Sequence, residues 1–175
     1  MKYNLIVAMC EDRGIGYKGQ IPWHNKADLK YFSKLTRGTG ENAIIMGSTT
    51  WKSLPNQYLP GRNNLIISST LKIHKIMSDG HIIKTFESID AVIKFCNLME
   101  YEEVWIIGGE SIYKQFLYRK IINKCYISTI SKHYESDAFF PEINNNEWKL
   151  SNSFILDDYT FVNIFSVASL ATDLP

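Results

Sequence analysis

The stretch VWIIGGESIYKQFL, Val104 to Leu117, is the strongest indication of fold class in the sequence. Its first four residues are apolar and predict a buried strand, and the glycine pair Gly108-Gly109 then predicts a tight turn. The apolar positions of Ile112–Leu117 follow the spacing of an amphipathic helix. A strand that passes through glycine into a helix is typical of a parallel sheet covered by helices.

The rest of the chain extends this alternation. Further strands are predicted over four apolar runs: Tyr3–Cys10, Asn42–Gly47, Asn64–Ser68 and His81–Thr85. Helices are predicted at Ala27–Leu35, at Ser48–Leu54 and after the N-cap residue Ser88. The helical pattern then stops, and the last predicted strands are Cys125–Ser131, Trp148–Phe154 and Thr160–Ala168. We therefore predict an α/β three-layer sandwich whose mixed, mostly parallel sheet has an antiparallel C-terminal edge.

Length and composition limit the classes of function. The 175 residues are typical of one compact domain, expected over residues 1–175. A net charge of +1 gives no broad basic field, so neither nucleic acid nor an anionic membrane is an expected partner. Three cysteines without CxxC spacing or a secretion signal predict reduced thiols and a cytoplasmic protein.

Two strand–glycine–helix junctions are candidate binding elements. IIGGESIY contains Gly108-Gly109, and IIMGSTTW contains Gly47. Glycine allows close approach of a ligand, and the helix N-terminus that follows offers free N–H groups to phosphate. The two junctions could clamp one long phosphate-bearing ligand, or they could be unrelated tight turns. The Gly-x-Gly-x-x-Gly pattern is absent, which disfavours an ordinary Rossmann domain.

Two charged residues are candidates for binding a second ligand. In PWHNKADLKYF, Asp28 could simply complement the helix dipole, or it could be an inward carboxylate on a face with Leu29 and Phe32. An inward carboxylate would need a partner such as an amidine-like edge, which can donate two parallel hydrogen bonds. In LPGRNNLIISS, Arg62 is either a solvated charge or a clamp on a carboxylate. Trp23 is either a core residue or part of this site.

Six segments together resemble the dihydrofolate reductases over nearly the whole chain. They occur in the family's order and are AMCEDRGIG, IPWHNKADLKYF, NAIIMGSTTWKSL, LPGRNNLIISS, VWIIGGESIY and ESDAFFP. The resemblance implies that family's version of the three-layer sandwich, with a cis peptide between Gly108 and Gly109. It also implies reduction of 7,8-dihydrofolate by NADPH, with hydride transfer to C6 and protonation at N5. No fused thymidylate synthase is expected within the 175 residues.

The resemblance implies roles for the substrate-site residues. Asp28 would bind the pterin N3 and 2-amino group with support from Ser128, and Trp23 would hold a water near the reacting edge. Arg62 would bind the glutamate α-carboxylate of the substrate. The other residues implied to line the substrate are Ile6, Val7, Leu29, Phe32, Leu54 and Ile107.

The resemblance also implies a set of cofactor-binding residues. Ala8 and Ile15 would offer backbone groups to the nicotinamide carboxamide, with Gly16, Tyr113 and a mobile loop at Ile21 nearby. The phosphates and the adenosine would contact Gly47, Ser48, Thr49, Thr50, Ser68, Ser69, Thr70, Gly108, Gly109, Glu110, Ser111 and Ile112. No metal site is expected.

The cofactor end departs from the family pattern. Ser48 and Ser111 stand where well-known bacterial relatives carry arginine near the adenosine phosphate, although Lys72 and His74 follow closely in the sequence. NADPH is still expected over NADH. The other expected ligands are antifolate inhibitors, and the expected state is a monomer. Two rival hypotheses are a pyrimidine reductase of riboflavin synthesis and a non-catalytic nucleotide-binding module with the same scaffold.

Overall fold

The computed structural model describes residues 1–168, so the last seven residues of the expected domain 1–175 lie outside the described residues. Its centre is a nine-stranded sheet in the order β10-β11-β8-β1-β7-β3-β4-β6-β5. The parallel strands are β1 (Lys2–Cys10), β3 (Ala43–Gly47), β4 (Asn63–Ile67), β6 (Ile82–Phe86), β7 (Glu103–Gly108) and β8 (Ile122–Ile130).

Both edges of the sheet are antiparallel. At the C-terminal edge β11 (Thr160–Val167) pairs antiparallel with both β8 and β10 (Trp148–Asp157), which confirms the predicted architecture. At the opposite edge β5 (His74–Ile76) pairs antiparallel with β6 and was not predicted. The sequence of β5, His-Lys-Ile, is exposed at every position and is too short to show an alternating pattern.

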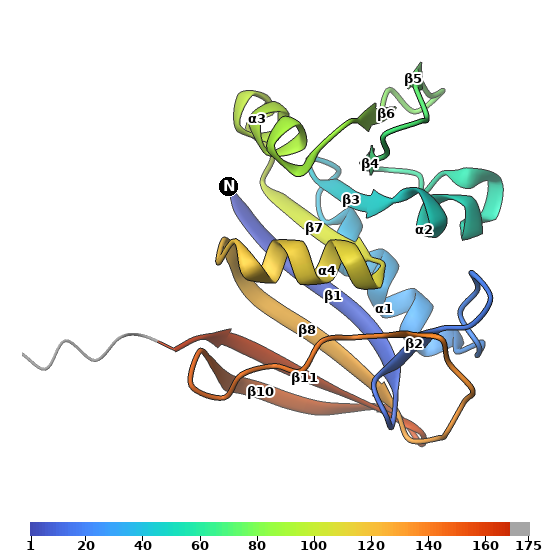
Figure 1. Cartoon of the computed structure of the whole chain (residues 1–175), viewed down its shortest axis with the longest axis vertical. Helices are drawn as coiled ribbons and strands as arrows, with labels where there is room; N and C mark the ends of the chain where they lie inside the picture. The colour runs from blue at the N-terminus through green and yellow to red at the C-terminus, as the bar shows by residue number, and fades with distance from the viewer. Residues whose placement is uncertain (169–175) are drawn as a thin grey trace, which may run out of the picture.

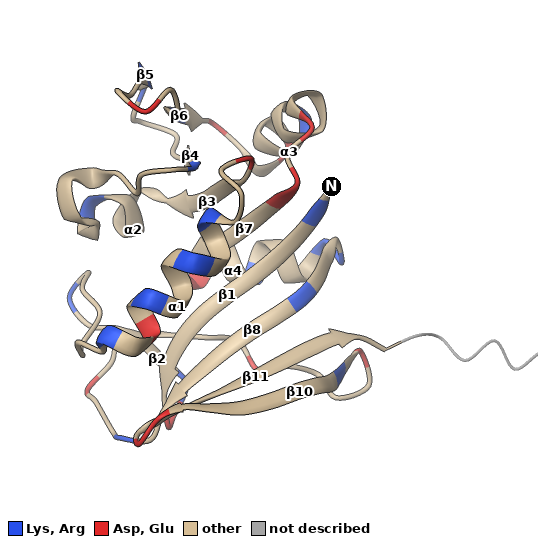
Figure 2. Cartoon of the chain, turned by 180° about the vertical axis from the view of Figure 1, so that it is seen from behind, with Lys and Arg blue, Asp and Glu red and all other residues tan. Residues whose placement is uncertain are grey.

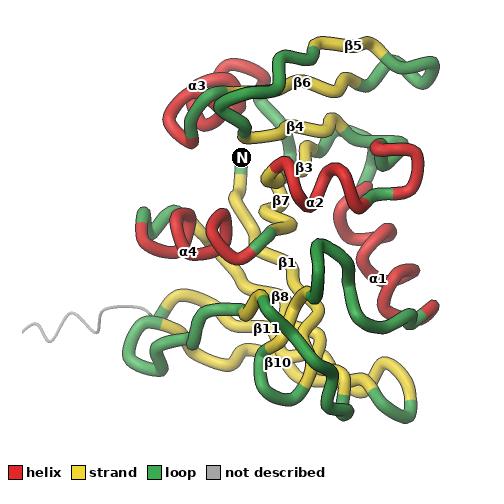
Figure 3. The backbone as a smooth tube through the Cα atoms, turned by 45° about the vertical axis from the view of Figure 1, so that its right-hand side comes forward, coloured by secondary structure: helices red, strands yellow, loops and turns green. Residues whose placement is uncertain are grey.

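Helices cover both faces of the sheet (Figures 1 and 3). On one face α3 (Ile89–Met99) and α4 (Glu110–Tyr118) pack on Leu5 and Val7 of β1. On the other face α1 (Lys26–Arg37) and α2 (Ser48–Ser53) pack in the core that contains Ile6, and the short 3-10 turn η1 (Pro55–Gln57) follows α2. Because successive strand residues point to opposite faces, one apolar run fills two cores, and the predicted three layers are confirmed.

A small second sheet joins two loops. It pairs β2 (Gly14–Gly16) with β9 (Ala138–Phe139) and was not predicted, because strands this short carry no periodic signal. The polar segment Ile143–Glu147 contains no helix or strand. Within residues 1–168, no helix has the length and apolar character needed to cross a membrane.

Helix α1 corrects one detail of the prediction. Phe32 and Leu35 pack against the sheet, but Leu29 is 48% exposed and does not share their inward face. Leu29 lies about 100° around the helix from Asp28, so it sits on the flank of α1. This position leaves its side chain available to a ligand.

Candidate active site

The N-terminus of α1 holds Asp28 in a fixed position. Asn25 is the N-cap, and its Oδ1 accepts a hydrogen bond from the Asp28 N–H at 2.9 Å. The Nδ2 of Asn25 donates to Asp157 Oδ2 at 3.0 Å and to Thr160 Oγ1 at 2.7 Å. The start of the helix is therefore fastened to the β10–β11 turn.

Asp28 is a buried carboxyl group with no cationic partner. Its residue is 8% exposed, which confirms the predicted inward placement. Burial raises its pKa and the nearby negative charge of Asp157 raises it further, while a hydrogen bond with Ser128 lowers it in part. No Lys, Arg or His within residues 1–168 forms an ion pair with Asp28. A buried carboxylate in this state favours a ligand that can donate hydrogen bonds.

Two further polar side chains lie near Asp28, one on β8 and one on α4. Ser128 is 2% exposed and pairs with Ala8 across strands β8 and β1. The hydroxyl of Tyr113 donates to the Ile6 carbonyl at 2.8 Å. Burial, and next the charge of Asp28, raise the pKa of Tyr113, so its hydroxyl stays protonated and can act as a donor.

The two glycine junctions lie side by side at the carboxyl ends of β3 and β7. A Cβ on Gly47 would lie 3.9 Å from the Gly108 oxygen, and one on Gly109 would lie 3.6 Å from Thr50 Oγ1. The expected cis peptide between Gly108 and Gly109 is present. Neither Gly47 nor Gly109 caps its helix with a side chain, so the N–H groups at the starts of α2 and α4 remain available. This geometry favours one phosphate-bearing ligand over two unrelated turns.

Arg62 lies at the opposite end of α1 from Asp28 and is only 3% exposed. Its Nη1 donates to Thr36 Oγ1 at 2.6 Å, and its Nε donates to the Pro60 carbonyl at 2.9 Å. Its Nη2 makes no hydrogen bond to another described residue, and no carboxylate of residues 1–168 pairs with it. Burial lowers the pKa of Arg62 to about 10, and the neighbouring Arg37 contributes to this shift. The solvated alternative for Arg62 is therefore wrong, and a clamp for an anion fits.

The comparisons with known proteins agree with this arrangement. A family model described as dihydrofolate reductase matches residues 2–162. The chain belongs to the dihydrofolate reductase family. The dihydrofolate reductase of Drosophila melanogaster is 34% identical over 149 residues, which cover 82% of this chain and 81% of that protein. The Gallus gallus enzyme is 34% identical over 158 residues (84% and 82%), and the viral dihydrofolate reductase of Saimiriine herpesvirus 2 (strain 488) is 36% identical over 157 residues (84% and 72%).

In this member of the family, the segment before α1 is fastened to the β9 region. The ring centroids of the half-buried Trp23 and Tyr134 are 5.5 Å apart. The Asp137 N–H donates to the Gly16 carbonyl at 2.9 Å, and Asp137 in turn accepts from the Lys18 N–H at 3.0 Å. Between these two contacts Ile21 is 55% exposed.

Glu110 also makes a contact that the resemblance does not imply. Its carboxylate accepts the Phe139 N–H at 2.7 Å and lies 3.7 Å from Lys114 Nζ. Both carboxylate oxygens of Glu110 therefore have partners, one in β9 and one within α4.

The other residues predicted to line the substrate fall on two faces of the sheet. Leu54 and Ile107 are half-buried beside Phe32 in the core under α1 and α2. Val7 is buried, and its side chain packs in the core under α3 and α4, on the other face of the sheet. On the cofactor side, Ile15 and Ser48 are half-buried and Ile112 is buried, while Thr49 and Ser111 are exposed.

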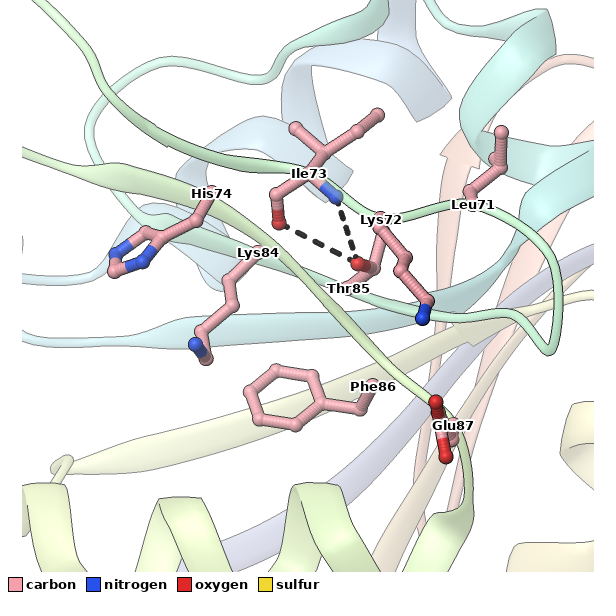
Figure 4. Close-up of a pocket in the computed structure, with 8 residues that line it drawn as sticks. All are labelled: Leu71, Lys72, Ile73, His74, Lys84, Thr85, Phe86 and Glu87. Atoms are coloured by element: carbon pink, nitrogen blue, oxygen red, sulfur yellow. Dashed lines mark hydrogen bonds between the residues drawn. The ribbon is translucent and has the colours of Figure 1, made fainter.

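The loop after β4 contains three of the residues predicted to contact the adenosine. The Ser68 hydroxyl accepts from the Leu71 N–H at 3.0 Å, and this bond leaves Ser69 and Thr70 exposed at the tip of the turn. The chain next borders an open pocket of about 400 Å³ between the segment before β5 and strand β6. Figure 4 shows its lining residues, which are Leu71, Lys72, Ile73, His74, Lys84, Thr85, Phe86 and Glu87. This pocket is separate from the Asp28 region.

A supporting network around Asp79 was missed by the sequence analysis. Its carboxylate accepts from the Tyr58 hydroxyl at 2.7 and 2.8 Å, from the Gly61 N–H at 2.9 Å and from the His81 N–H at 3.0 Å. These hydrogen bonds hold the pKa of Asp79 well below its usual range, and the bond from Tyr58 makes the largest contribution. The network fixes the loop before Arg62. A Ser-Asp-Gly turn signals a loop but does not reveal which distant N–H groups its acid will bind.

Proposed function

We propose that this chain is a dihydrofolate reductase. It transfers a hydride from NADPH to C6 of 7,8-dihydrofolate and adds a proton at N5, which yields tetrahydrofolate for one-carbon metabolism and thymidylate synthesis. The observation that carries this proposal is the pair of buried, unpaired charges, Asp28 and Arg62, at opposite ends of α1 in a chain of this family. Dihydrofolate has donors at its pterin end and carboxylates at its glutamate end, so it matches both.

Asp28 binds and polarises the pterin. Its carboxylate accepts hydrogen bonds from N3 and the 2-amino group, and Ser128 orients the carboxylate. A water held near Trp23 delivers the proton to N5, and we do not assign direct transfer to Asp28. Because the site is poorly solvated, the polarising effect of this charge on the ring is larger than it would be in water. Ile6 and Ile107, whose side chains face the α1 side of the sheet, fix the plane of the ring, and Val7 contributes backbone between them.

The flank of α1 holds the rest of the substrate. Leu29, Phe32 and Leu54 contact the benzoyl group, and Arg62 binds the glutamate α-carboxylate through its free Nη2. The exposure of Leu29 supports this role, because a large apolar side chain on the rim of a cleft gains burial when a ligand arrives.

NADPH supplies the hydride when it is bound. The nicotinamide is surrounded by Ala8, Ile15, Gly16 and Ile21. The Tyr113 hydroxyl donates to the Ile6 carbonyl and holds this carbonyl at the edge of the nicotinamide. The free N–H groups after Gly47 and Gly109 support binding of the phosphates. The residues assigned to this part are Ser48, Thr49, Thr50, Gly108, Glu110, Ser111 and Ile112.

The adenosine end determines the choice between NADPH and NADH. Ser68, Ser69 and Thr70 offer hydroxyl and backbone groups, and we propose that Lys72 and Lys84 supply positive charge in place of the arginines of relatives. Both lysines line the pocket in Figure 4, although Glu87 also borders it. The test is the ratio of kcat/KM for NADPH to that for NADH. Equal values would contradict the preference, and Lys72→Gln is expected to lower the ratio.

From the size, charge and cysteine pattern of the chain we infer one domain over residues 1–175, a monomeric state and a cytoplasmic location, without a nucleic acid or membrane partner. Antifolates that carry a diaminopyrimidine edge are expected to bind Asp28, because they present the same two donors as the pterin.

One measurement tests the activity directly. Purified, folded protein is mixed with NADPH and 7,8-dihydrofolate, and the loss of NADPH absorbance is followed against a control without dihydrofolate. A dihydrofolate-dependent rate is expected. No rate would favour the two rivals, and these are then separated by assaying an aminopyrimidine precursor of riboflavin, which only the pyrimidine reductase would reduce.

A further inference from the structure

A second arginine lies beside Arg62. Arg37 is the last residue of α1, and its guanidinium packs against Gly61, where an added Cβ would lie 2.9 Å from the Arg37 Cζ. Gly61 directly precedes Arg62, and the positive charge of Arg37 contributes to the lowered pKa of Arg62 after the larger effect of burial. Two guanidinium groups therefore share one small region.

The position of Arg37 on α1 places it on the substrate side of the helix. Residues four apart lie on the same row, so Leu29, Ser33 and Arg37 form one line along α1. Leu29 begins this line at the proposed benzoyl site, and the Ser33 carbonyl faces Arg62 Nη1 at 3.5 Å. The lysines of α1 follow a different row, and Figure 2 shows Lys and Arg residues recurring along this helix.

Neither guanidinium has a protein counter-ion. Among residues 1–168, no ion pair involves Arg37 or Arg62. The carboxylate bound nearest to Gly61 is that of Asp79, and its oxygens already accept from Tyr58, Gly61 and His81. Two like charges held close together repel each other, and a ligand with two negative groups would relieve this repulsion.

We propose that Arg37 is a second anion-binding residue of the substrate site and contacts the γ-carboxylate of the glutamate tail, next to the α-carboxylate on Arg62. This inference rests on the proposed function. The two arginines together recognise a dicarboxylate rather than a single carboxylate, so Arg37 determines specificity for the glutamate part of the substrate.

A simpler role for Arg37 is to complement the C-terminal end of the α1 dipole. Lys34 is also a basic residue in the last turn and would serve that role equally. Lys34 lies off the Leu29–Arg37 row and is exposed. Lys34→Gln is therefore a matched control that removes the same charge from the same turn.

The experiment compares ligands with and without the glutamate. Dissociation constants for dihydrofolate and for dihydropteroate, which lacks glutamate, are measured by quenching of tryptophan fluorescence. Arg37→Gln is expected to weaken dihydrofolate binding about three- to tenfold and to leave dihydropteroate binding unchanged. Arg37→Gln should also make the affinity for dihydrofolate less sensitive to added salt. Lys34→Gln should leave the dissociation constants of both ligands unchanged. Arg37→Lys keeps the charge and is expected to retain most of the affinity.

Other results would overturn the inference. Equal weakening of both ligands would indicate a structural role, and an unchanged dihydrofolate constant would show that Arg37 makes no contact. Equal effects of Arg37→Gln and Lys34→Gln would indicate a general field or dipole effect. If wild-type protein reduces dihydrofolate but Arg37→Gln behaves normally, only the role of Arg37 fails. If wild-type protein neither binds nor reduces dihydrofolate, the proposed function fails and this inference fails with it.

Discussion

Replacing Asp28 with asparagine tests the centre of the site. The new amide side chain keeps one oxygen that can accept from Ser128, but its NH₂ group faces a donor of the pterin. The variant thus loses one charge-assisted hydrogen bond, which contributes about 1.5–3 kcal/mol. It also places the NH₂ donor of the asparagine against an N–H donor of the pterin. We expect turnover at neutral pH to fall at least ~10²-fold, in the range typical of general acid–base groups.

The same substitution is expected to stabilise the free protein. Burial raises the pKa of Asp28, so the folded state binds a proton more readily than the unfolded state. Wild-type protein therefore loses stability as pH rises from the unfolded pKa of aspartate through the raised folded pKa, and the full loss is present above it. An amide does not titrate, so Asp28→Asn should have a higher Tm than wild type at pH 7 and a smaller difference in acid.

The assay combines steady-state kinetics with thermal unfolding across pH. Asp158→Asn is the control, because Asp158 is exposed in the β10–β11 turn and makes no side-chain hydrogen bond to the described residues. Near-normal turnover of Asp28→Asn would refute the assignment of the pterin carboxylate. A lower Tm at pH 7 would instead refute the argument that burial of this charge opposes folding.

Three further substitutions test the surroundings of this site. Asp157→Asn removes a negative charge that raises the pKa of Asp28, so the acidic limb of the kcat/KM profile should move to lower pH, and an unmoved limb would contradict the coupling. Arg62→Ala should weaken dihydrofolate binding by about 2–5 kcal/mol in a titration, and an unchanged dissociation constant would exclude its role. Gly14→Ala places a Cβ 2.6 Å from the Ser136 Cβ, so urea unfolding should show a loss of about 1–3 kcal/mol, partly restored by adding Ser136→Gly.

The layers of the fold were predictable from apolar periodicity. The run Tyr3–Cys10 is apolar because β1 is buried on both faces, and the Ser88 N-cap accepts from the Ala91 N–H as its position predicts. The three strands that were missed, β2, β5 and β9, are two or three residues long. Such strands are specified by pairing with a distant segment, and that pairing leaves no periodic signal in the local sequence.

The chemistry of the site was only partly predictable from the residues themselves. Asp28 and Arg62 each had an ordinary alternative, and only their burial without a partner decides between the alternatives. The contacts of Arg62 with Thr36 and of Asp28 with Ser128 join elements far apart in the chain. A sequence without coordinates cannot reveal such contacts, because they depend on how the helix is seated on the sheet.

Helix α1 sets the distance between the two buried charges, because it carries Asp28 and binds Arg62 through Thr36. Asp28 is in the first turn of α1, and Arg62 binds Thr36 in the last, so the charges are about 12 Å apart along the helix axis. At this separation they cannot form an ion pair, and each remains costly to bury in the free protein. A ligand of matching length with donors at one end and carboxylates at the other neutralises both charges at once. Shortening the ligand at either end would leave one charge unpaired, so we expect substrate length and charge to be recognised together.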